Sequence, residues 1–167
     1  NIKTILDYSV EGKNDELSFQ KTYIEIINNL KEASQNQLIP FCVFKITGIA
    51  RFSLLKKLDK KEQLTKKEEL EFKLVVSRLN EICKKAKENK IRILIDAEES
   101  WIQNTIDELS EKMMAKYNIS DVIVYNTVQL YRSDKLYYIE KLNQKAKNRN
   151  YKLGLKLVRG AYMEKER

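Results

Sequence analysis

The chain has 167 residues, and its balance of 43% hydrophobic and 34% charged residues suits one globular domain, with no apolar stretch of the roughly 20 residues that a membrane helix needs. The absence of histidine excludes Ser-His-Asp and Cys-His catalysis and removes the commonest metal ligand, so any chemistry must use carboxylates, cations or a bound cofactor. The net charge of +8 is spread over every segment, with lysines alternating with acids at helical spacing, which indicates solvated helix faces and disfavours a nucleic-acid surface.

The hydrophobic pattern alternates between short apolar runs and longer amphipathic segments. In chain order it predicts a strand at 2–6, a helix at 17–33, a strand at 41–46, a short helix at 51–58 with a turn at 59–61, a helix at 64–86, a strand at 91–95, a helix at 101–117, a strand at 121–128, a helix at 135–146 and a strand at 153–158. Ser133 or Asp134 is expected to cap the last helix.

Most of the predicted strands are apolar at successive positions, which favours a parallel sheet covered on both faces. Strictly alternating strands and helices form either a doubly wound open sheet or part of a (β/α)8 barrel. An open sheet commonly carries a Gly-rich phosphate loop after its first strand, but the turn at 7–12 reads DYSVEG and has no GxGxxG pattern. The barrel is therefore the favoured fold.

Polar residues lie at or just after the carboxyl end of each predicted strand, where barrel enzymes place their chemistry. These residues are Asp7 with Glu11, Lys45, Asp96 with Glu98, Gln129 with Arg132, and Lys156 with Arg159. Any one of them has an equally simple interpretation as the start of a solvated loop, and Gly160 as a turn or bulge glycine. Lys45 differs because it lies inside an apolar run, where a buried ammonium needs an anionic partner. Asp96 on the neighbouring strand is the expected partner, in a binding site or in a purely structural ion pair.

The two cysteines do not indicate a metal or redox site. Cys42 lies in an apolar run and Cys83 on the apolar face of a predicted helix, 41 positions away, so they form no Cys-X-X-Cys pair. We expect both to be buried and reduced, and we predict no metal ligands.

Five motifs together resemble the first five strand regions of proline dehydrogenases, in order and spacing. They are LDYSVEGK at 6–13, VFKITGIA at 43–50, LIDAEESW at 94–101, NTVQLYR at 126–132 and KLVRGAYMEKER at 156–167. The resemblance implies that residues 1–167 form the N-terminal part of an incomplete (β/α)8 TIM barrel, strands 1–5 with their helices. The remaining strands and the final helix would be missing, so this piece alone is expected to be inactive.

The resemblance also implies an activity. Family members bind FAD and oxidise L-proline to Δ1-pyrroline-5-carboxylate in proline catabolism, moving a hydride to flavin N5, and a quinone or another acceptor reoxidises the flavin. The implied catalytic residues are Lys45, Asp96 and Lys156. The implied substrate-binding residues are Lys45, Asp96, Ala161, Tyr162 and Glu11, the last at a gate, and the implied cofactor-binding residues are Gln129, Lys156, Arg159 and Gly160.

The sequence leaves the setting of this activity open. A cytoplasmic location, with peripheral contact at the inner membrane face, is the working expectation, and a mitochondrial location is the alternative. The exposed edge of an unclosed sheet would favour self-association. A non-catalytic assembly module built on a partial barrel is the alternative to the enzyme. Neither the electron acceptor nor the preference between proline and hydroxyproline is determined.

Overall fold

The computed structural model describes residues 2–7, 10 and 12–167. Its strands form one parallel sheet in the order β1 (Ile5–Asp7), β2 (Phe41–Phe44), β3 (Arg92–Ile95), β4 (Val124–Gln129) and β5 (Leu155–Val158). Each strand pairs with the next one in the sequence, as successive strands of a (β/α)8 barrel do. A doubly wound sheet would reverse its strand order at a switch point, so this order confirms the incomplete barrel over the open sheet.

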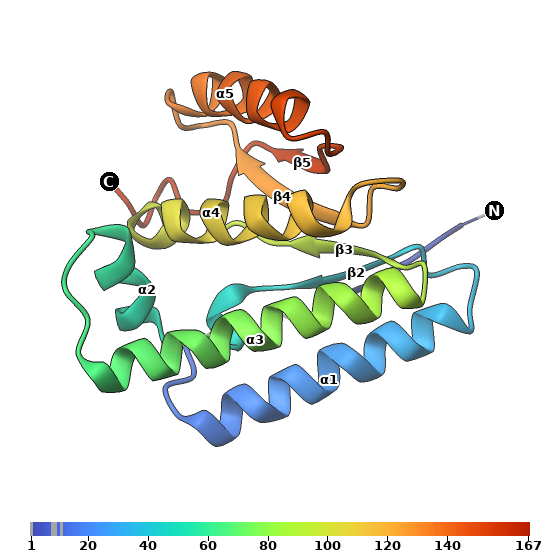
Figure 1. Cartoon of the computed structure of the whole chain (residues 1–167), viewed down its shortest axis with the longest axis horizontal. Coiled ribbons are helices and arrows are strands. Elements are labelled where there is room, and N and C mark those ends of the chain that lie inside the picture. Colours follow the sequence, from blue (N-terminus) through green and yellow to red (C-terminus); the bar gives the residue numbers. More distant parts are fainter. Residues whose placement is uncertain (1, 8–9, 11) are drawn as a thin grey trace.

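The helices connect the strands and cover one face of the sheet (Figure 1). They are α1 (Glu16–Ser34), α2 (Phe52–Asp59), α3 (Lys66–Glu88), α4 (Ser100–Tyr117) and α5 (Lys135–Asn148), with a single 3-10 turn, η1 (Ile46–Gly48), directly after β2. In Figure 1, α1, α3 and α4 lie next to one another across β2 and β3, and α5 lies beyond α4 over β4 and β5. The predicted order of strands and helices is therefore confirmed.

The core lies between the sheet and this helix layer. Phe44, Ile93 and Ile95 point from β2 and β3 into it and are fully buried. Leu79 and Ile82 of α3 are buried in the same cluster. At about 1.5–3 kcal/mol for each large apolar side chain removed from water, this layer supplies most of the stabilising free energy. This packing fixes the strands, and with them the positions of their carboxyl ends.

The start of the fourth strand differs from the sequence prediction because a side chain forms hydrogen bonds with the preceding backbone. The fourth strand was expected from residue 121 but begins at Val124, because the buried side chain of Asn118 binds the segment before it. Asn118 Oδ1 accepts the N–H groups of Ile123 and Val124 at 3.0 and 2.9 Å, and its Nδ2 donates to the carbonyls of Val124 and Lys152. One asparagine thus fixes the amino-terminal end of β4 beside the segment that leads into β5.

Capping side chains begin α1 and α3, whereas α2, α4 and α5 start without a side-chain cap hydrogen bond. Asp15 accepts the Ser18 N–H at 2.8 Å and begins α1, and Thr65 forms a capping box with Glu68 at the start of α3. Asp134 occupies the cap position of α5, as predicted, but makes no side-chain cap hydrogen bond. Its carboxylate instead accepts two hydrogen bonds from Arg132, at 3.0 and 2.9 Å.

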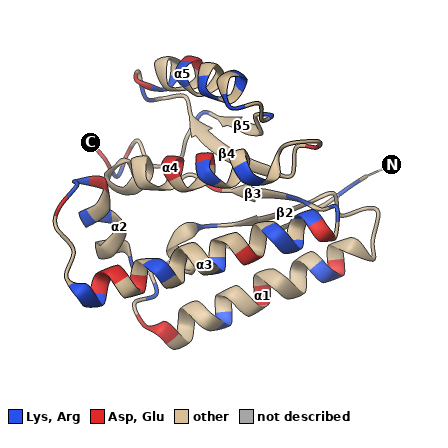
Figure 2. Cartoon of the chain, in the orientation of Figure 1, with Lys and Arg blue, Asp and Glu red and all other residues tan. Residues whose placement is uncertain are grey.

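The distribution of charged residues agrees with the solvated helix faces that the sequence predicts. Lys, Arg, Asp and Glu alternate along α3 in Figure 2, as on a solvated helix. Both cysteines are free and buried, as expected. No helix in the described part of the chain has the length and apolar character needed to cross a membrane.

Candidate active site

A cavity of about 300 Å³ lies at the carboxyl ends of strands β2 to β5. Its lining consists of Lys45, Asp96, Ala97, Thr127, Gln129, Lys156, Val158, Gly160, Ala161 and Tyr162. Parallel strands deliver their carboxyl ends to one edge of a sheet, which is why residues so far apart in sequence meet here. Seven of the nine residues singled out as a site from sequence line this cavity. Arg159 is exposed outside the lining, and Glu11 lies outside the described residues.

Asp96 and Lys156 form an ion pair in the lining of the cavity. Lys156 Nζ lies 2.7 Å from Asp96 Oδ1, and Thr127 donates its hydroxyl to the same oxygen at 3.2 Å. The lysine and aspartate side chains are 34% and 21% exposed, so water and ligands can reach both. The sequence suggested Lys45 as the partner of Asp96, whereas the structure joins Asp96 to Lys156 on β5, across the intervening β4.

Lys45 directs its ammonium toward the carboxyl-terminal segment. Its Nζ donates to the hydroxyl of Tyr162 at 3.1 Å and lies 5.7 Å from the centre of that ring. Lys45 has an extended backbone and lies between the end of β2 at Phe44 and the start of η1 at Ile46. The break in the strand at this point turns the chain and leaves the long lysine side chain at the cavity wall.

Gln129 and Gly160 form the part of the cavity lining between the ends of β4 and β5. Gln129 is 2% exposed; its Nε2 donates to the Glu98 carbonyl at 2.9 Å, and its Oε1 accepts the Ala161 N–H at 3.1 Å. Gly160 has φ +116°, and a Cβ built there would lie 2.2 Å from Cδ1 of Tyr131. Glycine is therefore required for close approach to Tyr131, in a conformation that other residues rarely adopt.

The loop after β3 joins the other strand ends to one another. Glu98 is 1% exposed, and its carboxylate accepts both the backbone N–H and the hydroxyl of Thr47, two residues beyond Lys45. Burial raises the pKa of Glu98 to about 7, although the hydrogen bonds from Thr47 oppose the shift. Glu98 and Thr127 are site-forming residues whose functions the sequence did not reveal. The only signals were an acid two positions after Asp96 and a threonine inside an apolar run.

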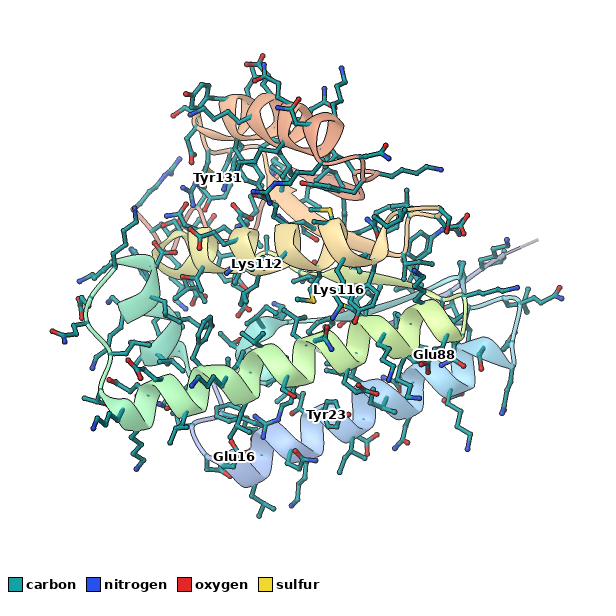
Figure 3. All side chains as sticks on the ribbon, viewed as in Figure 1. Glu16, Tyr23, Glu88, Lys112, Lys116 and Tyr131 are labelled. Carbon is teal, nitrogen blue, oxygen red and sulfur yellow. The ribbon has the colours of Figure 1, made fainter. Side chains whose placement is uncertain are left out.

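The carboxyl-terminal residues fold back over the start of α4. Glu166 accepts hydrogen bonds at 2.5 Å from the Ser100 N–H and from the Tyr131 hydroxyl. Burial and this carboxylate raise the pKa of Tyr131 to about 12. Figure 3 labels Tyr131 between the α4 and α5 layers, where it links the end of β4 to this segment. The segment carrying Ala161 and Tyr162 is thus anchored on both sides of the cavity.

The chain matches known proteins over its whole length. The family model for proline dehydrogenase matches residues 1–167. The carbapenem antibiotics biosynthesis protein CarD of Pectobacterium carotovorum subsp. carotovorum is 29% identical over 99% of this chain and 44% of that protein. The mitochondrial proline dehydrogenase 1 of Arabidopsis thaliana is 30% identical over 99% of this chain and 41% of that protein. The chain therefore spans less than half the length of these two relatives.

Solved structures share the fold. The proline utilization A (PutA) protein of Bdellovibrio bacteriovorus, inactivated by N-propargylglycine, superposes on 98% of this chain with a TM-score of 0.77 and 14% sequence identity. PutA from Corynebacterium freiburgense superposes on 99% of the chain with a TM-score of 0.76 and 17% identity. The matched regions are 18% and 16% of those much longer chains. At these identities the likeness shows the fold alone.

Proposed function

The chain belongs to the proline dehydrogenase family, and on that premise we propose that its cavity at the carboxyl ends of β2 to β5 serves the flavin-dependent oxidation of L-proline to Δ1-pyrroline-5-carboxylate. Residues 1–167 would form the N-terminal part of the barrel domain that carries out this reaction. The observation that carries the proposal is the convergence of Lys45, Asp96, Gln129 and Lys156 on one cavity from four different strand ends. In a barrel, this is where catalytic groups gather.

The residues at the β4 and β5 side of the cavity fit a flavin. Bound FAD would accept the hydride from the proline ring carbon beside nitrogen, and negative charge would develop on the flavin. Lys156 is a partly exposed cation at this wall, and Gln129 Nε2 has a second N–H beyond the one that binds Glu98. A cation and an amide donor at fixed positions stabilise such charge without reorganising. Arg159, exposed next to Gly160, is suited to a phosphate group.

Lys45 and its neighbours are suited to a small zwitterionic substrate. The Lys45 ammonium lies at the cavity wall beside the Tyr162 hydroxyl, and a cation of this kind is suited to pairing with a carboxylate. Fixing the carboxylate would orient the ring for hydride transfer. Ala161 and Tyr162 line the cavity next to it and would contact the ring, while Asp96 would hold Lys156 in place. A gating role for Glu11 follows from the family resemblance alone.

The test uses the full-length protein reconstituted with FAD. Lys45→Met should raise KM for L-proline by about tenfold or more while leaving flavin content unchanged, because a charge-assisted contact to the substrate is lost. Lys112→Met is the matched control: this lysine is exposed on α4, on the outer side of the helix layer in Figure 3. An unchanged KM in Lys45→Met would remove Lys45 from the substrate site, and absence of flavin binding by the wild type would refute the proposed function.

The partners and the location remain part of this proposal. A quinone or another acceptor would reoxidise the flavin, and contact with it would be favoured by peripheral binding at the inner membrane face of a cytoplasmic protein. Several relatives are mitochondrial by name, which supports the mitochondrial alternative. Self-association is favoured by the outer strands, where Ile5 of β1 and Leu157 of β5 are 49% and 57% exposed. Sedimentation of the chain as a monomer at micromolar concentration would argue against it.

A further inference from the structure

A buried polar network joins α4, β4 and α5, and none of its residues lines the cavity. Figure 1 shows α5 beyond α4, on the helix-covered side of the sheet. Lys135 and Asp107 form an ion pair of 2.7 Å whose side chains are only 3% and 6% exposed. The other Asp107 oxygen, Oδ1, accepts hydrogen bonds of 2.8 Å from Gln103 Nε2 and from Asn126 Nδ2. Tyr138 lies against the lysine, with its ring centre 4.7 Å from Nζ.

This network is not explained by stability alone. Removing two charges from water costs so much that well-packed apolar residues of the same volume often stabilise a protein equally well. What apolar residues cannot do is fix the direction of a neighbouring amide. Lys135 and Asn126 hold the carboxylate of Asp107, and this carboxylate can only accept hydrogen bonds, so it selects the NH₂ end of Gln103.

The fixed amide of Gln103 continues the network to the cavity wall. With its NH₂ group on Asp107, its Oε1 accepts the backbone N–H of Glu98 at 2.8 Å. The carbonyl of Glu98 accepts from Gln129 Nε2, and Gln129 Oε1 accepts the Ala161 N–H. Gln103 and Gln129 are each 2% exposed, so water does not compete for these bonds. Each link therefore determines the orientation of the next one.

We propose that Gln103, oriented by Asp107 and Lys135, is a positioning residue that sets the orientation of Gln129 in the cavity. The importance of this orientation for flavin binding rests on the proposed function. The hydrogen-bond chain itself rests only on the geometry of α4, the loop after β3 and the end of β4. Gln103 reaches neither substrate nor flavin, and acts through the Glu98 backbone.

The test replaces Gln103 with methionine, which has a similar length and cannot make either hydrogen bond. In Gln103→Met, amide hydrogen exchange should become about tenfold faster at Glu98 and at Ala161, because both N–H groups lose a fixed acceptor. In the full-length protein, flavin should bind about tenfold more weakly and its visible absorption spectrum should shift. Gln103→Ala, which leaves room for water, serves if the methionine variant does not fold.

Thr105→Val is the matched control on the same helix. It removes the buried hydrogen bond of 3.3 Å from Thr105 Oγ1 to the Leu55 carbonyl, which faces α2 and not the loop after β3. It should lower stability without changing exchange at Ala161 or the flavin spectrum.

Each outcome decides between the alternatives. Unchanged exchange at Glu98 and Ala161 in Gln103→Met would overturn the proposal whether or not flavin binds. An equal spectral shift in Thr105→Val would show that any loss of α4 stability has the same effect, and would overturn it too. A wild type that binds no flavin would overturn the proposed function, and exchange at Ala161 would still decide whether Gln103 positions Gln129.

Discussion

Two lysine–aspartate pairs in this chain have the same separation and opposite surroundings. Lys135 and Asp107 lie 2.7 Å apart on the helix side of β4, almost completely buried. Lys156 and Asp96 lie 2.7 Å apart at the mouth of the sheet, with about a third and a fifth of their side chains exposed. The same type of ion pair therefore has a different role in each place, because the burial differs. A buried pair is locked by its partners and can only hold structure, whereas an accessible pair can exchange its partner for a ligand.

Breaking the buried pair should have the largest effect. Lys135→Met leaves the Asp107 charge buried without its cation, so the free energy of unfolding should fall by about 3–5 kcal/mol. Urea unfolding followed by circular dichroism measures this loss. Replacing both partners, with Asp107→Asn added to Lys135→Met, should recover most of it. A loss of less than about 1 kcal/mol in the single variant would mean that the pair behaves as an exposed one.

Glu98 is a third buried or partly buried acid, and its carboxylate accepts hydrogen bonds from a threonine rather than from a lysine. Burial raises its pKa to about 7 in the folded chain, against an ordinary value of 4.5, so folding favours the protonated carboxyl. Stability should therefore decline as the pH rises from about 4.5 to 7, by about 3 kcal/mol attributable to this group, with the full penalty present above pH 7.

Glu98→Gln mimics the protonated carboxyl and cannot ionise, so this part of the pH dependence should disappear. Urea midpoints of both proteins at about pH 5 and 8 give the measurement. The variant should equal the wild type at the lower pH and exceed it at the higher. Parallel pH curves for the two proteins would show that Glu98 does not titrate in this range.

Breaking the accessible pair should cost little stability. Lys156→Met should lower the free energy of unfolding by no more than about 1 kcal/mol, because water solvates the remaining Asp96 carboxylate. In the full-length protein the same change should weaken flavin binding about tenfold, and Lys156→Arg should restore much of it by returning the cation. A stability loss as large as that of Lys135→Met would erase the distinction between the two pairs.

Salt concentration should have the smallest effect on stability, and this effect should differ between the exposed and the buried pair. At about 1 M NaCl the screening length falls to about 3 Å, which weakens interactions between solvent-accessible charges but hardly reaches buried ones. The stability cost of Lys156→Met should shrink by a few tenths of a kcal/mol, while that of Lys135→Met stays the same. Equal salt dependence of both costs would contradict the burial difference.

Much of the architecture was accessible from the sequence. Period and length of the apolar segments predicted each strand and α-helix of the described residues, since a strand buried on both faces and an amphipathic helix leave different patterns. The 3-10 helix η1 was not predicted, because residue 46 continues the apolar run of the second strand. The ends were less certain. Residue 121 looked like the start of a strand, but Asn118 holds the backbone up to Val124 through hydrogen bonds that no local pattern reveals.

The candidate site could be predicted only as a set of residues. Their positions after successive strands imply a common edge, and the structure places Lys45, Asp96, Gln129, Lys156 and the 160–162 segment around one cavity. Their pairing was not predictable. Asp96 binds Lys156 rather than the expected Lys45, because the register of β3, β4 and β5 decides which side chains meet.

The sequence by itself determined the alternation of strands and helices, the family, and the kinds of group at each strand end, because these depend on residue type and spacing along the chain. Only the tertiary structure decided which lysine meets which aspartate, that Glu98 is buried against Thr47, and that Gln103 connects the α4–α5 network to Gln129. Burial and partner choice depend on residues that are distant in sequence and brought together by packing of the sheet against its helices. The same two residue types therefore form a rigid support in one place and a ligand-accessible pair in the other.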